Sequence, residues 1–344
     1  MIPVQNIYYM LAYAYRSLQE NGYKKLATEK FENIADMFSA ILCRGVSLQI
    51  KRGLGRAYIE KTEALSSPRG KIEIVSSIKT NTHLKKKLIC TVDDFSVNSY
   101  MNCIIKTTMC ELLKSNLNKG RKKELRKLLV FFDGIDVLDK HHINWKLRYD
   151  RNNHTYHLLI SVCYFIINGL LLTNTNGNTT HPDFFDEQKM HSLYENFILE
   201  YYKKEHPELH TSAPNINWKT DDCGYLLPQM KSDIVIANKC TKKTLIIDAK
   251  YYRHNLQTNT QYMTKSIHSG NLYQIFTYVK NWNVSLDETV SGMLLYARTE
   301  DSLQPHNQQY TIDGNNFFIK TLDLNCDFSE IKKQLDAIAQ LIKD

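Results

Sequence analysis

The sequence predicts an α/β protein in which an N-terminal α+β domain precedes a mixed β-sheet flanked by helices. Two apolar runs, Ile234–Ala237 and Leu245–Ile247, flank a polar turn, and their β-branched residues predict an antiparallel hairpin. Apolar residues then recur at helical spacing over Gly270–Trp282, and Ser291–Tyr296 reads as a further buried strand. The order helix, hairpin, helix, strand is typical of an α/β unit with a mixed sheet.

Length and charge distribution both favour two domains. A chain of 344 residues can bury two cores, and we place the N-terminal α+β domain at residues 1–150 and the second domain at residues 151–344. The first domain carries 26 Lys and Arg against 15 Asp and Glu, whereas the second carries 18 against 21. Basic surface favours a polyanion or an acidic partner, although a lysine-rich proteome would give the same excess.

The composition argues against several classes of protein. No run approaches 18 consecutive apolar residues, and the start MIPVQNIYYM lacks the basic and apolar regions of a signal peptide. The 8 Cys show neither a CxxC pair nor a spacing that suits zinc, so reduced thiols are expected. We therefore expect a cytoplasmic protein that does not span a membrane.

Helical and strand-like patterns alternate along the N-terminal domain. Apolar periodicity predicts helices at Pro3–Gln19, Phe31–Gln49 and Asn98–Leu117. Between the second and third of these helices, Gly and Pro residues mark turns. We predict two strands there, near Arg56–Glu60 and Lys71–Val75, joined by a basic loop.

Two charged features of this domain favour ordinary surface positions. The basic run Lys119–Lys127 is helical, and we interpret it as a solvated face rather than a contact with a phosphate backbone. His141 and His142 are adjacent and point apart on any regular element, so we expect surface histidines rather than a metal site.

Five segments complete the second domain around the hairpin. His154–Leu172 predicts an apolar helix that opens the domain, and the polar Thr173–Thr180 is its expected flexible connection. Asp186–Lys204 and Phe328–Ile342 predict amphipathic helices, whereas Arg253–Ser269 is polar and reads as a loop.

The hairpin is predicted to bring two carboxylates and an amine together. If Ile236 faces Leu245, the same register sets Asp233 opposite Asp248, and Lys250 shares a strand face with Asp248. Like charges directly opposite each other destabilise a hairpin unless something neutralises them. A divalent cation would do so, and oxygen ligands alone favour Mg²⁺ over Zn²⁺.

The spacing acidic-x-Lys is not specific by itself, because the composition predicts roughly three matches by chance and there are three. Only Asp248-Ala249-Lys250 ends an apolar strand and has a second carboxylate in register. The alternative is a solvated hairpin end with an ordinary Asp–Lys pair. The run Leu245–Ile247 is apolar on both faces and belongs inside a sheet, where an aspartate needs a functional reason.

Three further residues are candidates for the same site. Glu195, on the helix predicted at 186–204, either faces solvent or looks inward at the carboxylates. Gln274 and Tyr278 lie one turn apart beside the apolar face of their helix, where packing is the ordinary role. Two carboxylates, a lysine and Mg²⁺ suit hydrolysis of a phosphodiester, with the lysine offsetting charge that develops in the transition state.

These segments resemble known nucleases. MKSDIVI, LIIDAKYY and NLYQIFTY are similar to the PD-(D/E)xK (restriction-endonuclease-like) superfamily, and the Gln274-x-x-x-Tyr278 helix is similar to that of RecB-like members. IPVQNIYYMLAYAY, ISVCYFIINGLLL, LLPQMKSDI and DAKYY resemble, in the same order, the McrC family, which is the nuclease subunit of the McrBC 5-methylcytosine restriction system. This resemblance runs from the N-terminus to about residue 296.

The resemblance implies a PD-(D/E)xK core that cleaves modified double-stranded DNA with Mg²⁺. It also implies a separate McrB-like AAA+ GTPase motor, which recognises the modified base and whose GTP hydrolysis the N-terminal half stimulates. The sequence agrees with such a partner, because it has no phosphate-binding loop of its own. The basic, Gly-rich segment Lys51–Lys79 is the candidate contact with the motor.

The resemblance also assigns roles to individual residues. Ser232 stands where the superfamily pattern has Pro, a position that tolerates variation. The metal ligands would be Asp233 and Asp248, and the catalytic positions would be Asp233, Asp248 and Lys250, with Glu195, Gln274 and Tyr278 as auxiliaries.

Two other functions remain open from the sequence. One is a non-catalytic adaptor that regulates the motor or holds DNA, with the acidic pair as a structural remnant. The other is a RecB-like exonuclease that degrades linear DNA with Mg²⁺ and without a motor.

Overall fold

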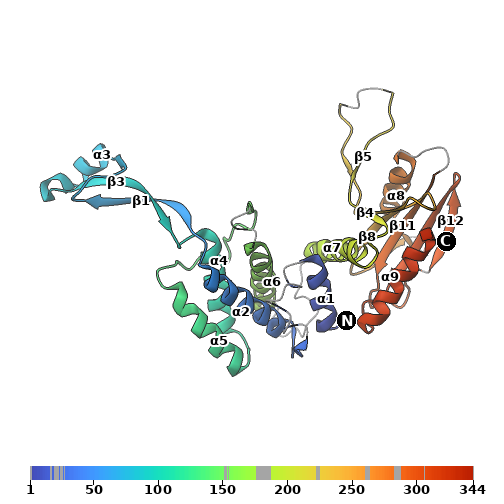
Figure 1. Ribbon diagram of the computed structural model, residues 1–344, viewed down its shortest axis with the longest axis horizontal. Helices are drawn as coiled ribbons and strands as arrows, with labels where there is room; N and C mark the ends of the chain where they lie inside the picture. The colour runs from blue at the N-terminus through green and yellow to red at the C-terminus, as the bar shows by residue number, and fades with distance from the viewer. Residues whose placement is uncertain are drawn as a thin grey trace. The chain divides into compact units, whose positions relative to one another are not determined.

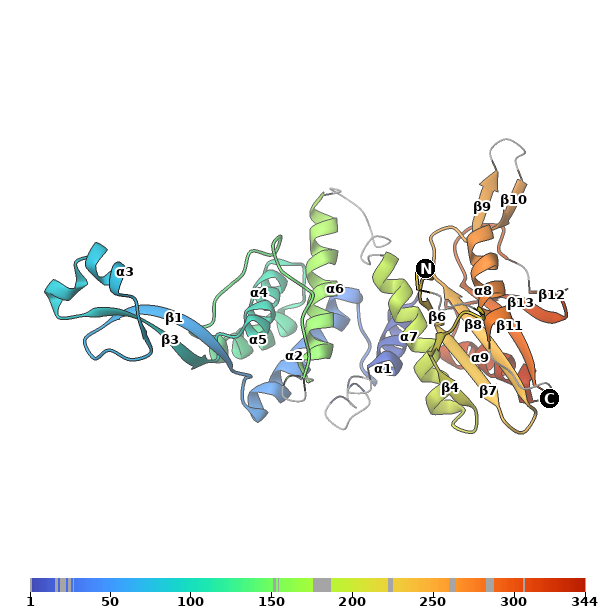
Figure 2. The same cartoon turned by 90° about the horizontal axis from the view of Figure 1, so that it is seen from above.

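The structure is a computed structural model that describes residues 2–15, 18, 23, 26, 28–150, 153, 155–175, 187–221, 225–259, 264–282, 288–305 and 307–343. Contacts divide the chain into two units, whose elements Figures 1 and 2 show in two views. The sheet unit comprises Met1–Phe31 and Asn178–Asp344, and the helical unit comprises Glu32–Gly177.

This division differs from the boundary predicted after residue 150. Helix α6 (Tyr156–Thr175) packs against α2 (Ile34–Arg52) and α4 (Tyr100–Lys114), so it belongs to the helical unit and does not open the second domain. Helix α1 (Val4–Ala14) contacts α7 (Glu187–Glu205) and lies in the sheet unit. Apolar periodicity predicted these helices, but it does not specify which element each apolar face meets.

The helical unit combines its helices with a three-stranded antiparallel sheet of order β1-β3-β2, which is an α+β arrangement. Side chains of Asn33, Ser99 and Asn118 cap α2, α4 and α5, because each accepts a hydrogen bond from the backbone N–H three residues later. The remaining elements of this unit are β1 (Ala57–Leu65), β2 (Lys71–Ile72), α3 (Ile74–Lys79), η3 (Thr82–Lys85), β3 (Leu88–Ser96), α5 (Lys119–Leu129) and η4 (Val130–Phe132).

The prediction of a strand over Lys71–Val75 is wrong beyond its first two residues, because the chain enters α3 at Ile74. The N–H of Ser77 donates to the carbonyl of Glu73 (3.0 Å), and its Oγ accepts from the N–H of Ile89 on β3 (2.8 Å). The helix therefore satisfies polar groups of its own and of the neighbouring strand. Strand β3 itself was not predicted. The other predicted elements of the helical unit are confirmed, and His141 and His142 are exposed.

The sheet unit is built on a mixed six-stranded sheet of order β12-β13-β11-β8-β7-β4. Strands β8, β11 and β13 run parallel, whereas the pairs β7–β8, β4–β7 and β12–β13 are antiparallel. The elements of this unit besides α1 and α7 are β4 (His210–Ser212), β5 (Asn215–Ile216), β6 (Met230–Lys231), β7 (Ile234–Asn238), β8 (Lys243–Lys250), β9 (Leu256–Asn259), β10 (Thr264–Ile267), α8 (Ser269–Asn281), β11 (Thr289–Ala297), β12 (Gln308–Ile312), β13 (Asn315–Leu322) and α9 (Phe328–Lys343).

Helices cover both faces of this sheet (Figure 1). Ile275 and Val279 of α8 pack with Ile246, Leu294 and Phe317 of the central strands in one buried cluster. Helices α7 and α9 lie against β7 and β8 and cover the alternate side chains of these strands. The sheet is therefore buried on both sides, as its continuous apolar runs predicted.

Outcomes differ among the other predicted segments of this unit. The helices predicted at 186–204, 270–282 and 328–342 and the strand at 291–296 are confirmed by α7, α8, α9 and β11. Arg253–Ser269 is not a plain loop, because it contains the hairpin β9–β10. Of Thr173–Thr180, the first three residues end α6, and residues 176–180 lie outside the described residues. Among the helices of the described ranges, none combines the length and hydropathy of a bilayer-spanning segment.

Candidate active site

The β7–β8 hairpin has the predicted register. Ile234 pairs with Ile247 and Ile236 with Leu245, so one further step places Asp233 opposite Asp248. The Oδ2 of Asp233 accepts a hydrogen bond of 2.9 Å from the N–H of Ala249, which fixes this carboxylate against the end of β8.

Asp248 is a buried carboxylate with unused hydrogen-bonding capacity. Its exposed fraction is 0% and that of Lys250 is 6%. The Nζ of Lys250 forms an ion pair with Oδ2 of Asp248 at 2.9 Å, whereas Oδ1 has no hydrogen-bond partner in suitable geometry among the described residues. A buried carboxylate oxygen without a partner is uncommon in folded proteins, because its desolvation is costly.

Helix α8 completes a chain of hydrogen bonds around the lysine. The Nζ of Lys250 donates to Oε1 of Gln274 (3.1 Å), and Nε2 of Gln274 donates to the hydroxyl of Tyr278 (2.9 Å). The Tyr278 hydroxyl in turn donates to the carbonyl of Lys231, two residues before Asp233 (2.9 Å). The structure therefore brings Gln274 and Tyr278 to the carboxylates, and their catalytic roles stay predictions.

Glu195 of α7 lies half-buried beside the aspartates. Its Oε1 is 2.7 Å from Nδ1 of His191, one turn earlier on the helix. The charge of Glu195 contributes to raising the pKa of both Asp233 and Asp248, which places it within their electrostatic reach. Of the two alternatives for this residue, the inward-looking one agrees with this arrangement.

The electrostatics of the site favour a bound cation. Burial raises the pKa of Asp233, and the charges of Asp248 and Glu195 raise it further. Burial also raises the pKa of Asp248, although Lys250 opposes this shift. Burial lowers the pKa of Lys250, but the neighbouring carboxylates outweigh it and the net pKa is raised. Without a cation, the raised pKa of Asp233 favours its protonated form at neutral pH, because one ammonium group does not stabilise the charges of both aspartates.

Asp233 and Asp248 fit a hard divalent cation as ligands. Their oxygens are the donor type that Mg²⁺ prefers, and Oδ1 of Asp248 has no hydrogen-bond partner among the described residues. Within the described ranges, no group of three or more His, Cys, Asp or Glu side chains is gathered for a metal. An ion held by two carboxylates would take its remaining ligands from water and substrate, which is usual for Mg²⁺.

Sequence reasoning did not find three supporting groups. The Oγ of the buried Ser232 donates to the carbonyl of Pro214 (2.7 Å) and ties β7 to the segment before β5. The backbone carbonyl of Lys231 holds Tyr278, and a backbone acceptor leaves no signal in the sequence. His191 was detectable, since a His and a Glu four residues apart on a helix form a pair.

Comparisons with known proteins agree on one family. The family model described as McrBC 5-methylcytosine restriction system component matches residues 4–297. The Type IV methyl-directed restriction enzyme EcoKMcrBC of Escherichia coli (strain K12) is 31% identical over 344 residues, with 97% of this chain and 96% of the relative covered.

Two solved structures are more distant matches. A refined half-complex of Thermococcus gammatolerans McrB AAA+ hexamers with bound McrC matches with a TM-score of 0.48 and 17% identity, covering 99% of this chain and 76% of that chain. The cryo-EM structure of the Thermococcus gammatolerans McrBC complex matches with a TM-score of 0.36 and 17% identity, covering 52% of this chain and 60% of that chain.

Proposed function

This chain belongs to the family of McrBC 5-methylcytosine restriction system components, and from that premise we propose that it is the subunit that cleaves DNA. It acts as a Mg²⁺-dependent endonuclease on modified double-stranded DNA in the cytoplasm, within a PD-(D/E)xK core. The observation that carries this proposal is the buried carboxylate of Asp248, with Asp233 opposite and Lys250 paired to one of its oxygens.

Asp233 and Asp248 would hold the ion. An ion held there would supply Lewis-acid polarisation of the scissile phosphate and would lower the pKa of a water molecule. The two carboxylates cannot both be fully charged at low energy without a cation, because burial and mutual repulsion raise the pKa of each. The binding of the ion therefore restores both to the charged form.

Lys250 supplies positive charge at a fixed point. Its raised pKa keeps the ammonium protonated, and hydrogen bonding to Gln274 restricts where the ammonium points. A preorganised cation stabilises the charge that develops on the phosphate in the transition state. Tyr278 holds Gln274 in place, so both residues position the lysine rather than react.

We propose that a GTP-driven AAA+ motor is the partner and that α3 takes part in the contact. Side chains of Ile74, Val75 and Ile78 are 64%, 66% and 59% exposed on this helix. They form an apolar surface within the segment Lys51–Lys79, and exposed apolar patches mark interaction sites.

The test is plasmid cleavage with the motor, GTP and Mg²⁺. Asp248→Ala and Lys250→Ala are expected to abolish cleavage while stimulation of GTP hydrolysis persists. If these variants cut at the rate of the wild type, the assignment of Asp248 and Lys250 as catalytic residues is wrong. Cleavage of linear DNA without the motor would instead favour the standalone exonuclease.

A further inference from the structure

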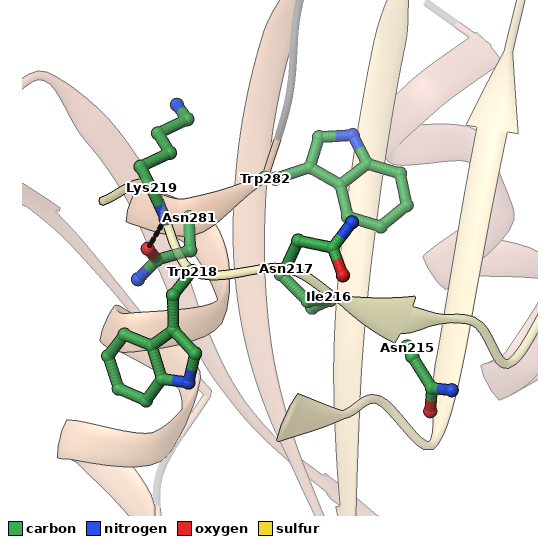
Figure 3. A pocket seen from close by; sticks show the side chains of 7 residues that line it. All are labelled: Asn215, Ile216, Asn217, Trp218, Lys219, Asn281 and Trp282. Atoms are coloured by element: carbon green, nitrogen blue, oxygen red, sulfur yellow. Dashed lines mark hydrogen bonds between the residues drawn. The ribbon is translucent and has the colours of Figure 1, made fainter. Parts of the chain in front are cut away.

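A pocket lies in the sheet unit (Figure 3). Its volume is about 400 Å³, which is within the range of ligand sites. Strand β5, the three residues after it and the C-terminal end of α8 form its walls. The lining residues are Asn215, Ile216, Asn217, Trp218, Lys219, Asn281 and Trp282.

The lining combines aromatic surfaces with amides. Two of the 3 Trp of the chain, Trp218 and Trp282, line this pocket. Figure 3 shows the exposed side chain of Asn217 directed toward Trp282. Asn281, by contrast, is held in place, because its Oδ1 accepts from the N–H of Lys219 (2.8 Å) and its Nδ2 donates to Thr277 (2.9 Å). An indole beside an amide suits a planar ring with polar edges, which describes a nucleobase.

The pocket is connected to the aspartates by two short paths. Asn215 pairs with Lys231, whose carbonyl accepts from Tyr278, and Asp233 follows two residues later. Along α8, Asn281 lies three residues beyond Tyr278. The pocket and the aspartates are therefore joined through β6 and α8 within the sheet unit, with Trp218 farther along, where its Nε1 donates to the carbonyl of Pro228 (2.7 Å).

Basic groups continue from the rim of the pocket. A second hollow of about 520 Å³ shares Lys219 and Trp282 with it and adds Lys243 and Lys280. The Nζ of Lys280 bonds to the carbonyl and the carboxylate of Asp313, which orders this side chain and offsets its charge. Lys219 and Lys243 are the lining residues whose ammonium groups suit the phosphates that flank a base.

We propose that this pocket binds one unstacked base of the DNA strand. The inference rests on the proposed nuclease function and adds a contact that grips the strand outside the candidate active site. Stacking on Trp282 supplies sequence-tolerant affinity, and the amide of Asn217 bonds the edge of the base.

Intrinsic fluorescence of the full chain tests the inference. Trp145→Phe leaves Trp218 and Trp282 as the only indoles, so the signal then reports on the pocket alone. The probes are a short single-stranded DNA oligonucleotide and free deoxynucleoside monophosphates, both in EDTA so that nothing is cleaved. We expect the oligonucleotide to quench the fluorescence and the monophosphates to bind at least tenfold more weakly. No quenching, or equal affinity for the monophosphates, overturns the inference.

Matched variants localise the binding. Asn217→Ala in the Trp145→Phe chain is expected to weaken oligonucleotide binding about three- to tenfold, whereas Asn325→Ala, an exposed residue outside the lining, leaves it unchanged. Equal oligonucleotide affinities of the two variants would overturn the proposal that this pocket binds DNA. Binding is measured without cleavage, so the two proposals can fail separately. A chain that binds the oligonucleotide in this pocket but never cuts DNA would contradict the nuclease proposal and not the base-binding proposal.

Discussion

The Nζ of Lys250 lies 2.9 Å from Oδ2 of Asp248, and both side chains are buried at the end of β8. A buried ion pair seldom stabilises a fold more than apolar residues of the same volume. Here a second carboxylate, Asp233, stands opposite, so ionisation of both aspartates would leave one negative charge uncompensated. Two buried aspartates beside one lysine are unfavourable for folding, and a bound cation would compensate for their charge.

The raised pKa of Asp233 predicts a specific pH dependence of stability. A folded state that binds a proton more tightly than the unfolded chain is most stable at low pH and loses stability as pH rises above the ordinary carboxyl pKa of 3.8. Without metal, Asp233→Asn should therefore unfold at a higher temperature than the wild type at pH 8 and at a similar temperature near pH 4. Thermal unfolding in EDTA across this range measures the difference.

Asp221→Asn, at an exposed position, is the matched control and should follow the wild type. Mg²⁺ at pH 8 should raise the unfolding temperature of the wild type and of this control but not that of Asp233→Asn. Parallel pH profiles for all three proteins would contradict the electrostatic account.

Gln274→Ala removes the acceptor that orients Lys250. We expect cleavage to slow about tenfold, which corresponds to 1.4 kcal/mol, the scale of one hydrogen bond to a charged group. Initial rates at saturating DNA measure the effect, because a positioning residue changes turnover more than binding. Tyr273→Ala, on the exposed side of the same helix, is the control, and equal losses in both variants would argue against a specific role for Gln274.

The sequence predicted the centre of the site but not its surroundings. Two continuous apolar runs and the polar turn between them determine the hairpin register, and the register alone sets Asp233 opposite Asp248. The helical spacing of Gln274 and Tyr278 likewise predicted their common direction. These features depend on local periodicity, which a sequence displays directly.

Other features depend on tertiary contacts and were missed. Strand β3 has buried apolar residues at Cys90 and Val92, but the adjacent pair Asp93–Asp94 interrupts this alternation, and β9 is largely polar, so neither shows the pattern of a half-buried strand over its length. The apolar α6 was assigned to the wrong unit, because its pattern does not name its partners. Trp218 and Trp282 lie 64 positions apart, and only the fold brings them to one pocket.

Gly292 should be sensitive to the smallest enlargement. A Cβ at this position would lie 2.8 Å from Ile275 and 2.9 Å from both Val279 and Phe317, because α8 approaches β11 closely there. Gly292→Ala is expected to cost about 1–3 kcal/mol of unfolding free energy, as overpacked cores do. Gly270→Ala on α8 is the control: its Cβ would meet open space, so the variant should be as stable as the wild type or more stable. Denaturant titration of the two variants decides, and equal stabilities would contradict the close packing.

The exposed face of α3 should matter for the partner and not for folding. Ile78→Asp is expected to reduce stimulation of GTP hydrolysis at least about tenfold while the unfolding temperature stays unchanged, since the side chain is 59% exposed. Val130→Asp, at a residue of the same unit that is 73% exposed, is the matched control. Equal stimulation by both variants would place the motor contact elsewhere.

Cleavage of modified plasmid DNA by Asp248→Ala, with the motor partner, GTP and Mg²⁺ present, tests the central claim most directly. We predict a loss of at least about 100-fold in cleavage rate, with stimulation of GTP hydrolysis retained. Cleavage at the rate of the wild type would contradict the account and leave the buried aspartate without a catalytic role.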